Sequence, residues 1–286
     1  MNAFYGGCDQ KAYLWNLQTQ QVEPIAQHNA PIKTVNPIPE ISCVATGGWD
    51  NCFNLWDLRQ ARGTLASSAA LPGKVYAADV KSMMIILCLA NRQVLLYDSR
   101  NMAQPYRIHN PELSYQLRSV ACFPDMQGFV TGSVEGKCEV AYLQPADQAK
   151  NFRFKCHVVD PVAFPVHRVV FHPIMTDVLA TAGGDGAIYT WNLAQRKRVA
   201  QLVSLQNGAA CTALSFSSNG NWLAYAAGYD WTRLQQGLSP GNPCLPPAHV
   251  FIKTLDSSHL QVPEHGGGSK HKQPSQPHHG KNNRRR

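Results

Sequence analysis

Hydrophobic and polar residues along residues 43–58 follow a pattern that predicts two strands joined by a tight turn. Val44 and Thr46 belong to residue types that favour strands, and the alternation resumes over residues 53–56. Between them, residues 47–50 read Gly-Gly-Trp-Asp, a composition typical of a turn. The stretch closes on Leu-Trp-Asp-Leu, which contains the WD dipeptide.

The same arrangement recurs along the chain. An Asp precedes a Trp by six residues in three places: Asp9 and Trp15, Asp50 and Trp56, Asp185 and Trp191. Weaker copies cover residues 91–97, where Tyr replaces Trp, and residues 135–141. The ends of successive copies lie 41, 41, 44 and 50 residues apart. A period of about 40 to 45 residues with four strands per unit predicts an all-β fold, the WD-repeat β-propeller.

The units differ in completeness. The first whole unit has expected strands at residues 32–37, 43–46, 53–56 and roughly 64–67, and further whole units are expected over residues 74–108, 118–156 and 166–203. Residues 1–27 supply only the later part of a unit, and the last unit has three strands between residues 212 and 255. We therefore expect a propeller over residues 1–256, with four whole and two partial blades, in a chain that lacks an N-terminal portion.

Charge is distributed unevenly over the 286 residues. The formal net charge is +8, yet residues 257–286 hold six of the 26 basic side chains and one acid, while the other residues hold 20 basic and 17 acidic side chains. This end is also rich in His and Gly, so we expect a disordered basic tail over residues 257–286. Residues 233–248 are rich in Pro and Gly and predict an insertion in the last blade.

The nine cysteines are scattered and never spaced Cys-x-x-Cys, so the sequence predicts free thiols in a reducing compartment and no metal site. No glycine-rich phosphate loop, nucleophile elbow or His-x-x-x-His pair is present, so we expect neither an enzyme nor a cofactor. The most apolar run, residues 83–90, is too short to span a bilayer, and Met1 leads directly into a repeat. We expect no signal peptide and no membrane insertion.

Several longer motifs are more specific than the WD dipeptide. They lie at residues 26–35, 46–50, 132–137, 152–157, 171–173 and 227–231. In these motifs the chain resembles WD-repeat mRNA export factors of the Rae/Gle type, over almost all of residues 3–255. The sister family, spindle-checkpoint propellers of the Bub type, shares the Glu-Gly-basic and Phe-Lys-Cys-His motifs. The resemblance implies seven blades, with the first blade and the start of the second missing here.

The aspartates of the WD units are expected to be structural. Asp9, Asp50 and Asp185 fall in turns between second and third strands, where a carboxylate can accept hydrogen bonds from backbone N–H groups and a nearby His or Ser/Thr. The tryptophans at the ends of these units are expected to pack between blades.

The family resemblance implies two binding sites. Lys137, with Phe154 and Lys155, matches a site for an acidic hairpin peptide, the GLEBS motif of a nucleoporin or checkpoint kinase. The family commonly has Arg at the position of Lys137, and Lys can still pair with a carboxylate but loses bidentate geometry. Three further residues match positions that in the family surround a groove for acidic peptides or nucleic acid: Trp191, Arg196 and Arg198.

The expected function is that of a non-catalytic adaptor that binds a nucleoporin and supports mRNA export at the nuclear pore. Its expected location is the nucleus and nuclear envelope, with shuttling to the cytoplasm. One alternative is a spindle-checkpoint adaptor that carries a checkpoint kinase to kinetochores. Another is a propeller scaffold that binds RNA or ribonucleoprotein directly through the basic tail.

Overall fold

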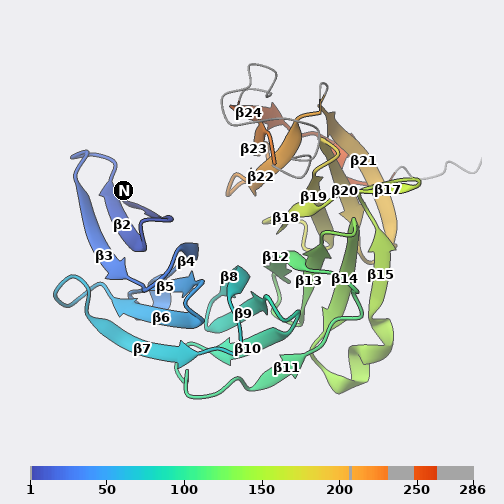
Figure 1. Cartoon of the computed structure of the whole chain (residues 1–286). Helices are drawn as coiled ribbons and strands as arrows, with labels where there is room; N and C mark the ends of the chain where they lie inside the picture. The colour runs from blue at the N-terminus through green and yellow to red at the C-terminus, as the bar shows by residue number, and fades with distance from the viewer. Residues whose placement is uncertain (1, 206–207, 231–247, 263–286) are drawn as a thin grey trace, which may run out of the picture.

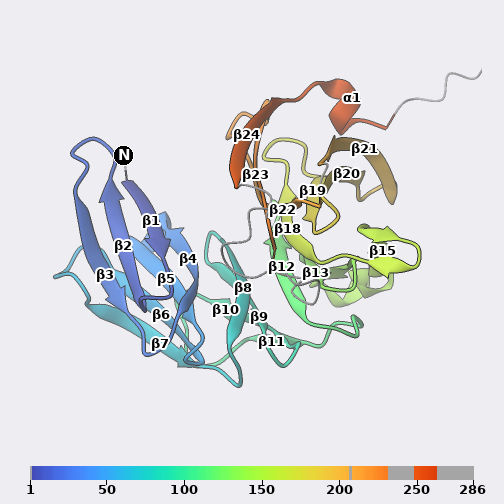
Figure 2. The same ribbon diagram turned by 45° about the horizontal axis from the view of Figure 1, so that its top comes forward.

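The structure of the chain is a computed structural model that describes residues 2–205, 208–230 and 248–262. Within these residues, antiparallel sheets follow one another in chain order around a common axis and form an incomplete ring (Figure 1). The ring is open between its first and last sheets, as the second view also shows (Figure 2). The all-β WD-repeat propeller predicted from the repeat spacing is therefore confirmed, with six blades.

Four blades have four strands each. The first comprises β4 (Ile32–Ile38), β5 (Cys43–Gly48), β6 (Cys52–Asp57) and β7 (Leu65–Ala70). The second comprises β8 (Val75–Lys81), β9 (Met84–Leu89), β10 (Val94–Asp98) and β11 (Arg107–His109). The third comprises β12 (Leu117–Cys122), β13 (Gly128–Ser133), β14 (Lys137–Tyr142) and β15 (Phe152–Lys155). The fourth comprises β18 (Val166–Phe171), β19 (Val178–Gly183), β20 (Ala187–Asn192) and β21 (Lys197–Ser204).

The two blades beside the opening have three strands each among the described residues. One comprises β1 (Asn2–Gly6), β2 (Lys11–Asn16) and β3 (Val22–Gln27), and the other β22 (Ala210–Phe216), β23 (Trp222–Gly228) and β24 (His249–Thr254). A two-stranded hairpin, β16 (Val158–Val159) and β17 (Val162–Ala163), connects the third and fourth of the four-stranded blades. Two 3-10 turns lie within blades, Pro39–Ile41 between β4 and β5 and Pro145–Lys150 between β14 and β15. The sequence pattern did not predict the hairpin.

The core lies between neighbouring blades, because the central strands are buried on both faces. All six residues of β9 are buried, and alternate ones face opposite neighbours. Ile85 and Leu87 pack with Phe53 of the preceding blade, whereas Ile86 packs with Phe129 of the following one. A strand buried on both faces reads as a continuous apolar run rather than an alternation, which explains the composition of residues 84–89.

The innermost strand of each blade lines the axis of the ring (Figure 1), and five of these strands share a β-bulge near their start. A bulge adds one residue that has no partner on the neighbouring strand, so its side chain is turned out of the regular ladder. The five extra residues are Lys33, Tyr76, Arg118, His167 and Thr212.

The predicted start of the tail at residue 257 is wrong. Ser257–Leu260 forms a short helix, α1, whose buried Leu260 lies against β20 and β21. Asp256 caps the helix by accepting the His259 N–H, and Thr190 Oγ1 donates to the His259 carbonyl at 2.7 Å. One helical turn is too short to leave a periodic sequence pattern. Residues beyond 262, and the insertion apart from its last residue, lie outside the described residues.

Among the residues that the structure describes, no helix is long and apolar enough to cross a membrane. The same residues contain no group of three or more His, Cys, Asp or Glu side chains placed to hold a metal ion.

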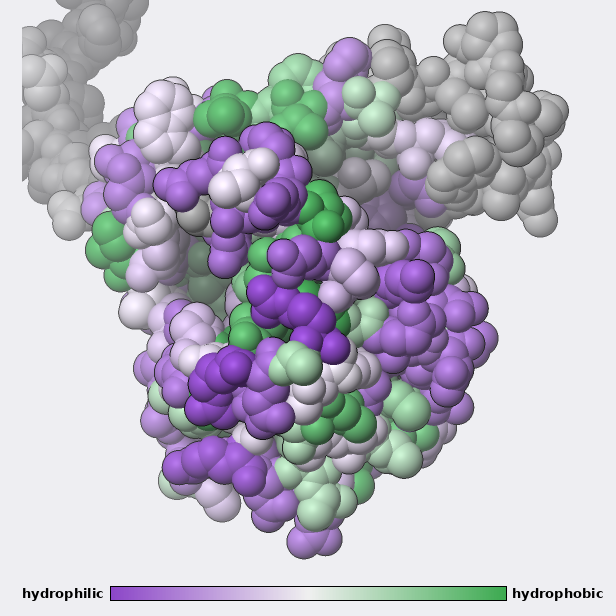
Figure 3. Space-filling view, turned by 90° about the vertical axis from the view of Figure 1, so that its left-hand side faces the viewer, coloured by the Kyte–Doolittle hydropathy of each residue, from purple (hydrophilic) through white to green (hydrophobic). Residues whose placement is uncertain are grey.

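The strands at the ring opening present apolar side chains to solvent. Val250 and Ile252 on β24 are 77% and 70% exposed, and no described strand pairs with the outer edge of β24. On the other side of the opening, β1 is an edge strand, and the surface of its blade is mainly hydrophilic with smaller hydrophobic areas (Figure 3). Exposed strand edges with apolar side chains pair readily with other chains.

We therefore expect the isolated chain to self-associate, and Val250→Lys with Ile252→Lys to raise the monomer fraction. Charged side chains on an edge strand oppose edge-to-edge pairing. Size-exclusion chromatography with light scattering measures this fraction. Leu65→Lys is the control, because Leu65 is also exposed, at 48%, but lies on β7 of a four-stranded blade. A wild-type chain that runs as a uniform monomer would contradict the expectation.

Candidate functional site

The short outer strand β15 carries two aromatic rings and two cations. Its sequence alternates Phe-Arg-Phe-Lys, so Phe152 and Phe154 are half-buried against the neighbouring blade whereas Arg153 and Lys155 are exposed. The register pairs Lys155 with Lys137 of β14. Three predicted peptide-binding residues, Lys137, Phe154 and Lys155, therefore meet on one pair of strands.

These residues line a groove of about 580 Å³. One wall is formed by β14 and β15, and the other by the chain between β11 and β12. The lining residues share a polar character and include His109, Glu112, Lys137, Glu139, Arg153 and Lys155, with Phe152 and Phe154 at the side toward the next blade. We call this the first groove.

Lys137 already has a partner within the chain. Its Nζ lies 2.6 Å from Oε2 of Glu135, whose carboxylate also accepts the Ser114 N–H at 2.9 Å. Burial alone would raise the pKa of Glu135, but the hydrogen bonds from Lys137 and Ser114 hold it below its usual value. A peptide carboxylate would have to share the ammonium of Lys137 with Glu135. An ammonium has three donors, so sharing is possible.

The wall opposite β15 is fixed by a buried carboxylate. Glu139 accepts hydrogen bonds from His109 Nε2 and from the backbone N–H of Glu112, both at 2.7 Å. Across the groove, Arg153 forms an ion pair with Glu112 at 3.1 Å. Lys155 makes no ion pair or side-chain hydrogen bond with the described residues. It is therefore the cation of this groove that is open to an incoming anion.

A second groove, of about 230 Å³, adjoins the first one at Phe152–Phe154. Its further lining residues are Trp191, Asn192, Leu193, Arg196 and Lys197, so its lining contains cations and no carboxylate. The ring of Trp191 packs on Phe154 at a centroid distance of 4.8 Å. The Arg196 guanidinium lies 4.5 Å from the Phe152 centroid and donates to the Lys150 carbonyl. Rings next to guanidinium groups form a surface suited to acidic or aromatic ligands.

Arg198 is not brought into this groove. Its guanidinium lies over the ring of Tyr189, 5.1 Å from the centroid, and Lys197 lines the groove instead. The pairing of β20 with β21 shifts register between Thr190 and Trp191. The family resemblance named Arg198, and sequence alternation alone does not locate a shift that brings Lys197 to the groove in its place. Arg153, on β15, was not named either.

Two of the WD aspartates anchor buried networks. Asp185 lies 2.8 Å from Nδ1 of His157, whose Nε2 lies 3.0 Å from Thr181 Oγ1. Trp191 Nε1–H donates to the same hydroxyl at 3.0 Å. These hydrogen bonds thus connect His157, at the end of the 152–157 motif, to the indole of Trp191, which forms one side of the second groove.

Asp50 anchors an equivalent network with His28, Thr46 and Trp56. Burial would raise the pKa of Asp50, but the Asn29 N–H and His28 hold it below its usual value. Asp9 differs, because its exposed carboxylate accepts from the Tyr13 hydroxyl at 2.7 Å and from the Lys11 N–H. Each of the three carboxylates accepts a backbone N–H within its turn. Sequence reasoning gave His and Ser/Thr as partner types but did not name the residues.

The fold and these turns define a class, the WD-repeat β-propellers. The family model "WD domain, G-beta repeat" matches residues 19–57 and 200–232. Protein Rae1 of Drosophila melanogaster is 31% identical over 248 residues, covering 83% of this chain and 70% of that protein. The mRNA export factor of Xenopus tropicalis is 36% identical over 251 residues, covering 83% and 67%. The mitotic checkpoint protein bub-3 of Caenorhabditis elegans is 31% identical over 237 residues, covering 80% and 68%.

The chain belongs to the WD-repeat family of Rae1/Gle2-type mRNA export factors, of which the Bub3-type checkpoint proteins are the sister family. The family predicted from the sequence motifs is confirmed.

Proposed function

We propose that this chain is a non-catalytic adaptor in mRNA export that binds an acidic hairpin peptide, the GLEBS motif of a nucleoporin, along β14 and β15. The names of its relatives support a role in export. The observation that carries the peptide site is the pair of adjoining grooves, in which Lys155, Arg196 and Lys197 form no ion pair among the described residues. A nuclear location at the pore, with shuttling to the cytoplasm, follows from this proposal.

The proposed site uses the two grooves for different parts of the peptide. Acidic side chains would meet Lys155 and share Lys137, while apolar side chains would contact Phe154 and Trp191. Charge-assisted contacts supply strength and orientation, and the aromatic floor supplies area that can be removed from water. A hairpin that crosses Phe152–Phe154 can reach both grooves at once.

We further propose that the assembled ring has seven blades, as the family resemblance implies. The opening between β1–β3 and β22–β24 is the place for the additional sheet. On their outer sides the edge strands β1 and β24 pair with no described strand, which supports the proposal.

The peptide site predicts unequal effects of charge reversal. Lys155→Glu should weaken binding of a synthetic nucleoporin GLEBS peptide by about tenfold or more, which is roughly 1.4 kcal/mol, because attraction is replaced by repulsion. Lys137→Glu should weaken binding as well and also place two carboxylates side by side at Glu135. Lys137→Arg should keep the affinity, because a guanidinium can pair with both carboxylates. Isothermal titration calorimetry measures each affinity.

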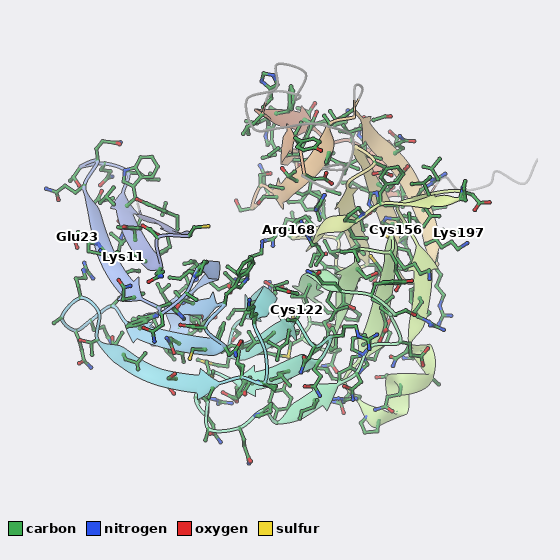
Figure 4. All side chains as sticks on the ribbon, viewed as in Figure 1. Lys11, Glu23, Cys122, Cys156, Arg168 and Lys197 are labelled. Carbon is green, nitrogen blue, oxygen red and sulfur yellow. The ribbon has the colours of Figure 1, made fainter. Side chains whose placement is uncertain are left out.

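Lys11→Glu is the matched control, since Lys11 is an exposed cation on β2, across the ring from β15 (Figure 4). It should bind the peptide as the wild type does. If all four variants bind equally, the peptide does not lie along β14 and β15.

The second candidate is a checkpoint adaptor, which the similarity to bub-3 of Caenorhabditis elegans favours. It would use the same grooves for the GLEBS motif of a checkpoint kinase. Titration of both peptides into the wild-type chain separates the candidates, because the physiological partner should bind more tightly by a clear margin.

A further inference from the structure

A small cavity lies between two neighbouring blades, beside the turn that joins β12 to β13 and the turn that joins β18 to β19 (Figure 1). Its volume is about 110 Å³. It shares one lining residue, Leu193, with the second groove and none with the first groove. Its lining combines three aromatic rings with a carboxylate from each turn: Phe123, Tyr142, Phe171, Asp125 and Asp177. We call this the aromatic cavity.

The three rings are set at steep angles to one another. The centroid of Phe123 lies 5.2 Å from that of Tyr142 and 5.3 Å from that of Phe171, with interplanar angles of 86° and 66°. Rings inclined in this way surround a ligand instead of forming one flat surface. Lys150 Nζ lies 5.9 Å from the Tyr142 centroid, but it pairs with Asp147 and does not line the cavity. Aromatic rings attract cations within about 6 Å, so this lining favours a cation.

The two carboxylates of the aromatic cavity have no cationic partner among the described residues. Asp125 Oδ1 accepts the Gln127 N–H at 2.9 Å, and the Asp177 carboxylate accepts no hydrogen bond from the described residues. Lys81 and Arg168 line an adjoining cavity of about 310 Å³ but not this one. The lining of the aromatic cavity therefore contains two carboxylates and no cation.

The turn next to Asp125 carries an exposed apolar side chain in a disfavoured conformation. Met126 is 43% exposed and has a φ of 60°. Of the eight non-glycine residues with positive φ in the described part of the chain, it is the only apolar one. In the corresponding turn of the next blade, Ile174 is 65% exposed. Exposure and a strained backbone do not stabilise a fold, so this turn points to a binding role.

We propose that the aromatic cavity binds an arginine side chain of a partner peptide, whose apolar neighbours contact Met126 and Ile174. The volume suits the end group of one side chain rather than a folded segment. A guanidinium is planar, is weakly hydrated, packs on aromatic rings and has five N–H donors, so it can serve both carboxylates. Each such contact is charge-assisted. The proposal is independent of the GLEBS site, because the two sites use different charged residues.

The test uses the full chain and the acetylated, amidated peptide Gly-Leu-Arg-Leu-Gly, with lysine and glutamine counterparts, and saturation-transfer NMR to measure affinity. The arginine peptide should bind about fivefold more tightly than the lysine peptide, and the glutamine peptide should bind least. Asp125→Asn and Asp177→Asn should each weaken arginine-peptide binding by about fivefold. Met126→Gly should weaken it too, while the midpoint of urea unfolding holds or rises, because glycine adopts positive φ without strain.

Glu40→Gln is the matched control. It removes an exposed carboxylate from the turn between β4 and β5, the corresponding turn of another blade, and should bind within about twofold of wild type. Lys155→Glu, which should weaken GLEBS binding, should leave arginine-peptide binding unchanged, so each proposal can fail without the other. Wild-type affinity in both Asp→Asn variants, or equal binding of the arginine and glutamine peptides, would overturn the proposal. Tighter binding of the lysine peptide would overturn the assignment to arginine.

Discussion

Replacing Asp185 by alanine should lower the free energy of unfolding by about 3 to 5 kcal/mol. Breaking a buried, hydrogen-bonded pair by removal of one partner has a cost of this size, because the remaining polar group stays buried without a partner. In this chain the ring nitrogen Nδ1 of fully buried His157 and the N–H of Ala187 would both lose their acceptor. Urea unfolding, followed by tryptophan fluorescence, measures the loss.

The effect should extend to the second groove. His157 positions the Thr181 hydroxyl, and that hydroxyl accepts the indole N–H of Trp191. Without Asp185 the indole is held less firmly against Phe154. We therefore expect weaker peptide binding in Asp185→Ala even at temperatures at which the variant is fully folded.

Asp9→Ala provides the comparison, because it removes the aspartate from the same position of another WD unit. The Asp9 carboxylate is exposed, and its partners Tyr13 and Lys11 can turn to water instead. The midpoint of urea unfolding should hardly change. Equal midpoints for Asp9→Ala and Asp185→Ala would show that the buried network does not stabilise the fourth four-stranded blade.

The repeat spacing predicted the fold because its causes are local. Turn residues such as Gly47 to Asp50, and the strands on each side of them, interact within about ten residues, so the pattern survives in the sequence. The partner of Asp50 is different in kind. His28 comes from 22 residues earlier, on the connection between two blades, and no local pattern identifies it.

The candidate site could be predicted only in part for the same reason. The family resemblance named Phe154 and Lys155 together with Lys137, and the three lie on one pair of strands because β14 and β15 are neighbours in sequence. Arg198 could be placed outside the second groove only with knowledge of the register shift between β20 and β21. Glu139 could be recognised as the anchor of the wall only with knowledge of its partner His109, 30 residues away. Family resemblance supplied the role of Lys137 but not its existing partner, Glu135.

Glu139→Leu is expected to cost about 3 kcal/mol of stability, toward the low end for a broken buried pair, because His109 keeps some contact with solvent. The substitution leaves the His109 ring and the Glu112 N–H without their acceptor. Glu139→Gln should cost less, about 1 kcal/mol, because the amide oxygen can still accept one of the two hydrogen bonds. Urea unfolding of both variants gives the two values.

Peptide binding by the Glu139 variants should also show whether the wall of the first groove contributes to affinity in addition to its cations. Glu139 does not need to touch the peptide, yet it anchors the segment from His109 to Glu112, which faces Arg153 and Lys155. We expect Glu139→Leu to weaken GLEBS-peptide binding about fivefold, and Glu139→Gln to weaken it less. Loosening of a wall should raise the dissociation rate, whereas loss of the Glu139 carboxylate makes the groove more positive and should not lower the association rate of an acidic peptide. Stopped-flow binding of a labelled peptide resolves the two rates. A Glu139→Leu chain that is destabilised but binds the peptide with wild-type rates would place the peptide outside the first groove and leave only the second groove as its site.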